Sequence, residues 1–248
     1  MGCSAGPSVT SAPALYLDAV NSKSYPGSGT TWTDLSGNGR NGTLVWGPTF
    51  DSANGGQIVL DGIGDHIVLN NCLPLKWQNI TAVSFDVIFK TLGNPNFNRQ
   101  YIFDSRKTDG VSYYAWYLLL IDGSSSWLTG VGNSASAPYS DFAFSTSSPA
   151  TGPIWHMTLT IDKQTITNNF KLYVNGTINT TKSFDFTINQ GSDPNQEMYL
   201  GGYFGNLGND SNYKLKGSYY MARVYKNTVL SADQVRQNFN AMRGRYGL

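Results

Sequence analysis

Two segments of the chain alternate between apolar and polar side chains, and this alternation restricts the fold more than any other feature of the sequence. In residues 83–89, valine and phenylalanine take every second position, and in residues 155–161 tryptophan, methionine, leucine and isoleucine do so. A period of two is that of a β-strand with one buried face. Both segments are therefore predicted to be half-buried strands.

Further strand candidates are separated by clusters of Gly, Asn, Ser and Pro. They are residues 15–20, 43–46, 57–61, 65–69, 100–104, 113–121, 170–178, 197–202 and 217–226. A composition that is 40% hydrophobic and only 13% charged also fits strands better than solvated helices. We predict an all-β sandwich formed by one domain at residues 14–248, preceded by a flexible arm at residues 1–13.

One helix is predicted near the C-terminal end. Ser231 can cap its first turn, and Gln234 three residues later completes a capping box. Gly244 is placed to end the helix. An apolar stripe at helical spacing predicts that the helix packs on the sandwich: Val235, Phe239 and Met242.

Charge and targeting signals exclude several classes of partner. A formal net charge of +1 provides no field that would attract nucleic acid or an anionic membrane. The longest apolar run, residues 115–121, is too short to cross a bilayer, and the first residues lack the architecture of a signal peptide. Cys3 and Cys72 are predicted to be free thiols. We therefore expect no nucleic-acid partner and no membrane partner.

Residues 32–43 place three glycines among Asp and Asn, and these residue types tolerate the positive φ of a tight turn. Their side-chain oxygens would also suit a hard cation such as calcium, although the spacing is not that of an EF-hand. The two interpretations are a metal-free turn, with no cofactor, and a structural calcium site held by Asp34, Asn38 and Asn41.

This turn, with the strand-like segments after it, resembles the opening of a laminin-G-like domain of the concanavalin A-like lectin/glucanase superfamily. Three later segments are similar to the late hairpin, the closing strand and the helix of that family: residues 170–176, 217–225 and 230–234. The ending at residues 238–247 is similar to the version found in tailed-phage structural proteins. The resemblance covers roughly residues 14–248 and implies a jelly-roll sandwich of two antiparallel sheets with one C-terminal helix.

The family pattern also bears on calcium. In many relatives the strand after the closing glycine carries an acidic residue that helps to hold the ion, whereas residues 217–221 supply none. This departure favours the metal-free turn.

Enzymatic members of the superfamily are glycosidases, and a retaining mechanism needs two carboxyl groups about 5 Å apart. The chain has one glutamate, Glu197, without a carboxylate two or four residues away. Its two histidines, His66 and His156, leave little room for a catalytic triad or a three-histidine metal site. We therefore expect no enzymatic activity and structural roles for both histidines.

Loops rich in aromatic and amide side chains remain as candidate binding surfaces, because sugars stack on aromatic rings and hydrogen-bond to Asn and Asp. A segment of more than twenty residues, 122–142, is predicted to be a long loop that presents such residues. The alternative is that many of these aromatics pack in the core. The carbohydrate-binding candidates are Trp127, Tyr139, Asp141, Phe142, Tyr203, Asn206 and Tyr213.

Together these features predict a non-catalytic, lectin-like protein of a phage virion surface that binds carbohydrate of a host surface. One alternative is a capsid decoration or fibre subunit that binds other virion proteins, or copies of itself, through residues 1–13. Another is a degenerate polysaccharide hydrolase. The absence of a signal peptide agrees with a virion protein that is made in the host cytoplasm.

Overall fold

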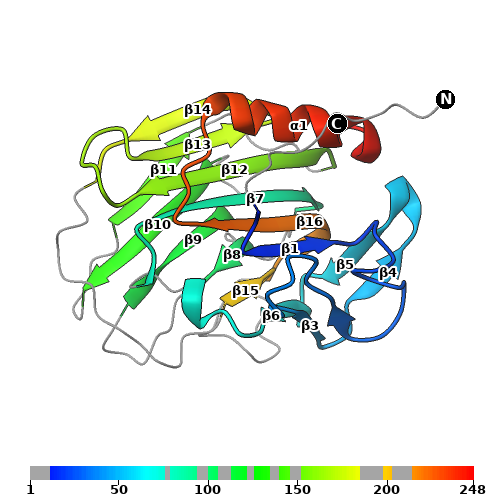
Figure 1. Ribbon diagram of the computed structural model, residues 1–248. Coiled ribbons are helices and arrows are strands. Elements are labelled where there is room, and N and C mark those ends of the chain that lie inside the picture. Colours follow the sequence, from blue (N-terminus) through cyan, green and yellow to red (C-terminus); the bar gives the residue numbers. More distant parts are fainter. Residues whose placement is uncertain are drawn as a thin grey trace.

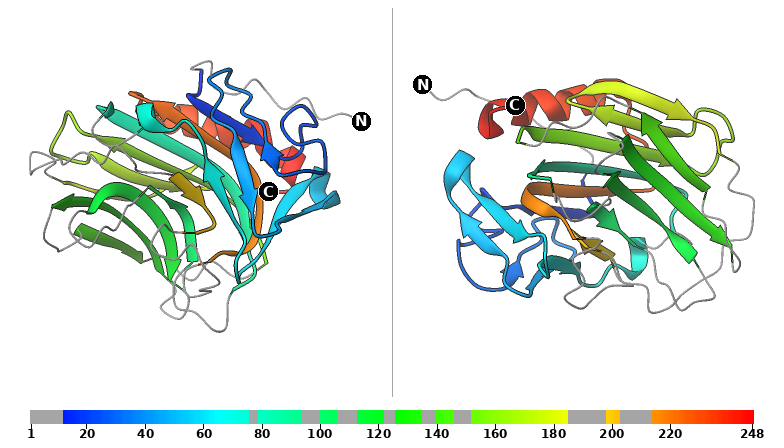
Figure 2. Two further views of the ribbon diagram at one scale, coloured as in Figure 1. Left: turned by 90° about the horizontal axis from the view of Figure 1, so that it is seen from below. Right: turned by 180° about the vertical axis from the view of Figure 1, so that it is seen from behind.

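Two antiparallel sheets of eight strands pack face to face and form the body of the protein (Figures 1 and 2). The computed structural model describes residues 12–75, 79–93, 100–105, 113–121, 126–134, 140–145, 152–184, 198–202 and 214–248, and within 113–145 it describes the backbone alone. The prediction of an all-β sandwich with one C-terminal helix is confirmed.

The first sheet, called the helix-bearing sheet, has the order β14-β13-β12-β7-β16-β5-β4, and β1 also pairs with β16. Its strands are β1 (Leu15–Asp18), β4 (Thr49–Asp51), β5 (Gln57–Asp61), β7 (Ala82–Thr91), β12 (Ile154–Asp162), β13 (Phe170–Val174), β14 (Thr177–Lys182) and β16 (Lys216–Lys226). Short 3-10 turns, η1 (Ala53–Gly55) and η2 (Leu73–Leu75), connect strands.

The second sheet, called the opposite sheet, has the order β11-β10-β9-β8-β15-β6-β3-β2. Its strands are β2 (Thr31–Trp32), β3 (Gly42–Val45), β6 (His66–Leu69), β8 (Gln100–Asp104), β9 (Tyr113–Ile121), β10 (Ser126–Ser134), β11 (Ser140–Ser145) and β15 (Met198–Leu200).

The expectation that residues 122–142 form a long loop is wrong, because β10 and the start of β11 lie within them. Two glycines and two serines hide the alternation in β10, so its strand propensity is weak. A nine-residue ladder with β9 and a six-residue ladder with β11 hold it in the sheet. Pairing with neighbours therefore decides the structure of this segment.

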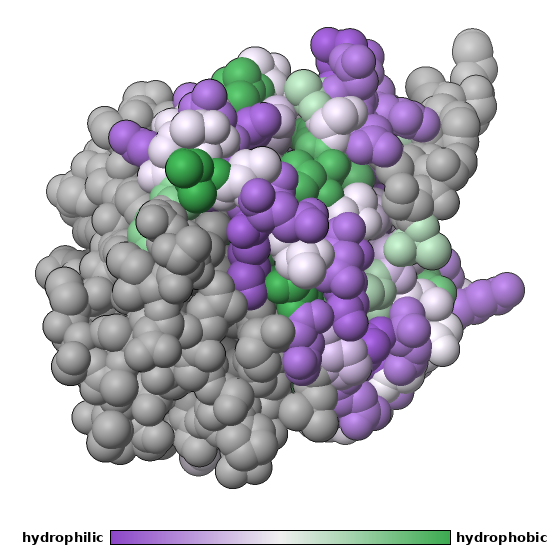
Figure 3. Space-filling view, turned by 60° about the vertical axis from the view of Figure 1, so that its left-hand side comes forward, coloured by the Kyte–Doolittle hydropathy of each residue, from purple (hydrophilic) through white to green (hydrophobic). Residues whose placement is uncertain are grey.

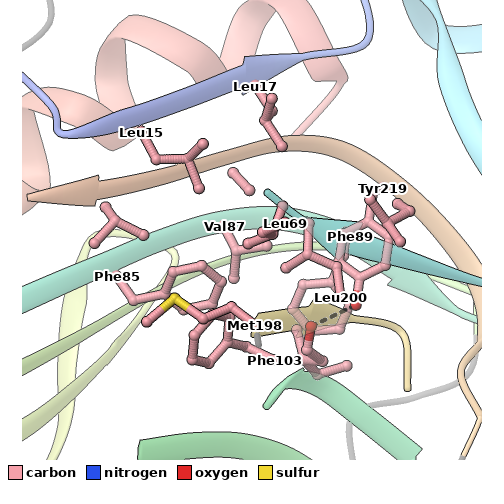
Figure 4. Close-up of a cluster of buried hydrophobic side chains, with 14 of the residues drawn as sticks. Leu15, Leu17, Leu69, Phe85, Val87, Phe89, Phe103, Met198, Leu200 and Tyr219 are labelled. Carbon is pink, nitrogen blue, oxygen red and sulfur yellow. Dashed lines mark hydrogen bonds between the residues drawn. The ribbon is translucent and has the colours of Figure 1, made fainter. Parts of the chain in front are cut away.

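The core lies between the two sheets and is built from their facing side chains (Figure 4). The rings of Phe85 on β7 and Phe103 on β8 are 4.7 Å apart and join the two layers. Tyr219 on β16 is fully buried, and its hydroxyl donates to the carbonyl oxygen of Ile102 at 2.6 Å. A buried phenol that crosses the core with its hydrogen bond satisfied fixes the relative position of the sheets.

Helix α1 (Ala232–Tyr246) packs on the outer side of the helix-bearing sheet (Figure 1). The predicted capping box is confirmed, because Ser231 accepts from the backbone of Gln234 and the Gln234 side chain accepts from that of Ser231. Gly244 does not end the helix, which continues to a left-handed cap at Gly247. Burial of Tyr246 in the last turn outweighs the cost of a glycine in a helix interior, about 1 kcal/mol.

The polar face of β7 and β12 is not exposed, contrary to the expectation of half-buried strands, because α1 covers it. Asp86 on β7 is fully buried and accepts hydrogen bonds from three side chains: His156 at 2.5 Å, Thr158 at 2.8 Å and Arg223 at 2.6 Å. Asn238 on α1 donates to the same carboxylate at 3.2 Å. The expected structural role of His156 thus takes the form of a buried polar cluster beneath the helix.

Candidate functional site

Three of the seven predicted carbohydrate-binding residues lie on the last two strands of the opposite sheet. Trp127 is on β10, and Asp141 and Phe142 are on β11. In the ladder, Trp127 is paired with Phe144, and Asp141 is paired with Gly130. The other four candidates, Tyr139, Tyr203, Asn206 and Tyr213, fall outside the described residues, as does Glu197.

Strand register assigns Asp141 and Phe142 to different rows across the opposite sheet. The row of Phe142 runs through Thr129 and Leu118 to Phe103, which is part of the core. The row of Asp141 runs through Gly130, Tyr117, Asp104, Tyr199 and Val68 to Thr43. Because successive residues of a strand face opposite sides of a sheet, the second row marks the outer face of the opposite sheet.

The outer face continues into a polar group that the sequence did not single out. His66 is 2% exposed, its Nδ1 lies 2.9 Å from the carbonyl oxygen of Gly64, and its ring is 6.1 Å from that of Tyr199. Lys214 is fully buried, and its Nζ lies 3.5 Å from His66 Nδ1. The expected structural role of His66 thus takes the form of a buried ring with a hydrogen-bond partner, whereas the burial of Lys214 has no local signal in the sequence.

Asp65 precedes His66 and lies at the end of the same face. Its side chain is nearly buried, and Oδ2 accepts the backbone N–H of Asp61 at 3.1 Å. Burial raises the pKa of Asp65, and the negative charge of Asp61 raises it further. The hydrogen bond from the Asp61 backbone and the charge of Lys214 lower the pKa, but they offset only part of this rise. A carboxyl group of this kind holds a proton more readily than an exposed one.

The calcium candidates lie in a turn that is closed by its own hydrogen bonds. Oδ1 of Asp34 accepts the backbone N–H groups of Tyr16 and Ser36, and Oδ2 accepts the Ser36 hydroxyl and the Arg40 N–H. Oδ1 of Asn41 accepts the N–H of Asp34. Burial opposes ionisation of Asp34, but these hydrogen bonds hold its pKa below the usual value.

The third candidate, Asn38, donates its side-chain amide to the carbonyl oxygen of Ala14 at 3.2 Å. The side chains of this turn thus tie it to the start of β1. Across the described part of the chain, no group of three or more His, Cys, Asp or Glu residues is arranged to hold a metal ion. In the same residues, no helix is long and apolar enough to span a membrane.

Two facing antiparallel sheets, a helix across the outside of one and a polar outer face on the other define a lectin-like β-sandwich. The sequence profile of the concanavalin A-like lectin/glucanases superfamily matches residues 61–236. The chain therefore belongs to that superfamily. No curated protein matches the sequence.

Similar solved structures come from toxins and from a sialidase. The botulinum neurotoxin serotype G binding domain is 16% identical with a TM-score of 0.65, and the match covers 92% of this chain and 50% of that one. The binding domain of botulinum neurotoxin DC, in complex with SialylT, is 13% identical with a TM-score of 0.68, over 93% of this chain and 52% of that one. At these identities the likeness shows the fold alone.

The sialidase of Trypanosoma rangeli, in complex with sialic acid, is 13% identical with a TM-score of 0.64, over 96% of this chain and 34% of the enzyme. The chain thus spans about half the length of the toxin binding domains and a third of the sialidase.

Proposed function

We propose that the protein is a non-catalytic, carbohydrate-binding protein of a phage virion surface that contacts glycans of the host surface. Its membership of a lectin/glucanase superfamily supports carbohydrate as the ligand class. Two of the similar structures carry ligands named SialylT and sialic acid, which agrees with this class. The virion setting rests on the likeness of residues 238–247 to the ending found in tailed-phage structural proteins.

The observation that carries the proposal is the placement of Asp141 in the outer-face row of the opposite sheet. Trp127 is three residues from Gly130 along β10, and Gly130 is the partner of Asp141 on β11. Because successive residues of a strand face opposite sides of a sheet, this odd separation assigns Trp127 to the face opposite that of Asp141. Of the two, Asp141 is the residue that can supply a hydroxyl acceptor on the outer face. Because β11 ends the strand order of the opposite sheet, Asp141 lies at the sheet edge.

The proposal includes no hydrolysis, because Glu197, the only glutamate of the chain, has no carboxylate two or four residues away, whereas a retaining glycosidase uses a pair of carboxyl groups. We expect β-glucans, agar-type polysaccharides and capsular polysaccharides to release no more reducing ends with the wild type than with Glu197→Gln. Turnover that this substitution abolishes would contradict the non-catalytic role. The sialidase likeness does not bear on it, since the match covers a third of that enzyme.

A glycan array tests carbohydrate binding directly. Asp141→Asn is expected to weaken binding of every glycan that the wild type retains, while Ser126→Ala, at the start of β10, leaves it unchanged. Loss of one hydrogen bond to a charged group corresponds to an affinity weaker by about tenfold or more. Circular dichroism of each variant serves as the folding control. A wild type that binds no glycan would refute the proposal and favour a purely structural virion role.

A further inference from the structure

Trp46 stands out from the rest of the described surface. Its side chain is 59% exposed, and its φ of 73° lies in the left-handed region that a bulky residue rarely adopts. No described residue forms a hydrogen bond or a ring contact with the indole. On the face that Figure 3 shows, the described surface is largely hydrophilic, with hydrophobic residues in small separate groups. The chain thus holds a large aromatic ring in water on a constrained backbone.

The turn that carries Trp46 lies beside the turn between β5 and β6. Val45, the last residue of β3, is paired with His66, the first residue of β6. A Cβ on Gly47 would lie 3.8 Å from Oδ1 of Asp65. Ile63, in the same neighbouring turn as Asp65, is 56% exposed. The two turns therefore bring an exposed indole, an exposed isoleucine and a nearly buried carboxylate to one end of the sandwich.

Within the described part of the chain, the carboxylate of Asp65 keeps one acceptor position open on this side. Oδ2 accepts the Asp61 N–H, and no donor among the described residues reaches Oδ1. Gly47 has no side chain to cover that oxygen. Its φ of 116° favours glycine, so any other residue at this position would be strained. A hydroxyl donor from outside the protein would complete the hydrogen bonding of Asp65.

The charges around this end are balanced. Asp61 is opposite Lys216 in the ladder between β5 and β16, and Lys214 lies close enough to Asp65 to lower its pKa. Two carboxylates and two ammonium groups give no net field that would select a charged ligand. A ligand with one apolar face and several hydroxyl groups fits this combination, and a pyranose ring has both.

We propose that Trp46, Gly47, Ile63 and Asp65, called the Trp46 site, bind a neutral pyranose, which stacks on the indole and donates a hydroxyl to Asp65. This inference rests on the proposed carbohydrate-binding function and adds a second contact point and a ligand class. Val45 and His66 are on the outer face of the opposite sheet, two residues along β3 and β6 from the Thr43–Val68 pair. The Trp46 site thus continues the outer face beyond the ends of β3 and β6.

Nuclear magnetic resonance of the tryptophan indole N–H groups tests this assignment. The chain has six tryptophans, and the peak lost in Trp46→Asn identifies Trp46. Asparagine tolerates the left-handed region, so this variant is expected to keep the wild-type melting temperature. Methyl glycosides of glucose, galactose and mannose are titrated as neutral probes, with sialyllactose as the acidic probe. We expect at least one neutral glycoside to shift the Trp46 peak, and sialyllactose to shift it less.

The variants separate stacking from other effects. Trp46→Asn is expected to weaken the neutral glycoside about tenfold, while Trp46→Phe, which keeps a ring, retains most of the affinity. Ile166→Asn removes an equally exposed apolar side chain between β12 and β13 and should change nothing. If glycans bind but leave the Trp46 peak unmoved, the Trp46 site is refuted and the proposed function stands. If neither the array nor the titration detects binding, both fail.

Discussion

Arg245 in the last turn of α1 donates from Nη1 to Oδ2 of Asp18 on β1 at 2.8 Å, across 227 residues of sequence. Tyr246 donates its hydroxyl to the other oxygen of Asp18 at 3.2 Å, and Tyr16 donates to Oδ2 at 3.1 Å. The Asp18 side chain is almost fully buried. The two ends of the folded domain are therefore joined at a single carboxylate.

Arg245→Ala is expected to lower the free energy of unfolding by about 1–2 kcal/mol, since it removes a charged donor from a buried carboxylate. Arg236→Ala is the matched control, because the Arg236–Asp233 pair has the same chemistry on the same helix but is exposed on both sides. Its loss should cost less than about 0.5 kcal/mol. Urea unfolding of both variants measures the difference, and equal effects would show that the Asp18 contact contributes little.

Acidification is expected to destabilise the protein through Asp86. Burial alone would raise the pKa of this carboxyl, but His156, Arg223 and the hydrogen bonds hold it well below the usual value. The unfolded chain, with a carboxyl pKa of about 3.9, binds the proton first as the pH falls. The contribution of Asp86 is therefore fully present above about pH 5 and is lost as the pH falls toward the folded-state pKa.

Urea unfolding between pH 6 and pH 2.5 tests this sign. Asp86→Asn should be less stable than the wild type at pH 6 by about 3 kcal/mol or more, because Arg223 loses its buried partner. Its stability should then fall less on acidification than that of the wild type. Parallel pH profiles for the two proteins would show that Asp86 does not carry the acid sensitivity.

The strands and the helix start could be predicted from the sequence where local signals agree with burial. The alternation in residues 155–161 and the capping box at Ser231 are signals of this kind, and both are confirmed. The burial of Asp86 and His156 could not be predicted, because they occupy the polar phase of their strands. The helix that covers them begins more than seventy residues after His156.

Trp46 is an apolar residue whose exposure could not be predicted from the sequence. A tryptophan at the end of a strand candidate is expected to lie in the core, and only the following Gly47 and Pro48 indicate a turn. Its exposure depends on the passage of the chain from β3 in one sheet to β4 in the other, and periodicity does not report such a crossing. Sequence reasoning therefore proposed Trp127, which it placed in a loop, and missed Trp46.

Cys72 is expected to resist modification in the folded protein. Burial raises the pKa of its thiol to about 12, so almost no thiolate forms at pH 8. A Cys3→Ser variant isolates Cys72 for reaction with a chromogenic disulfide reagent. Labelling should be complete in urea and slower by orders of magnitude in buffer. Rapid labelling of the folded variant would show that the segment around Cys72 opens readily.

The turn at Asp34 is expected to keep its shape without calcium, because both carboxylate oxygens already accept hydrogen bonds from the protein. The side-chain oxygen of Asn41 likewise already accepts the backbone N–H of Asp34. EDTA should leave the melting temperature nearly unchanged, whereas Asp34→Ala should lower it equally with and without calcium, since three backbone N–H groups lose their acceptor. A calcium site occupied at 100 times its dissociation constant would contribute about 2.7 kcal/mol. A fall of several degrees on adding EDTA, reversed by calcium and absent in Asp34→Ala, would instead show that the turn is a calcium site.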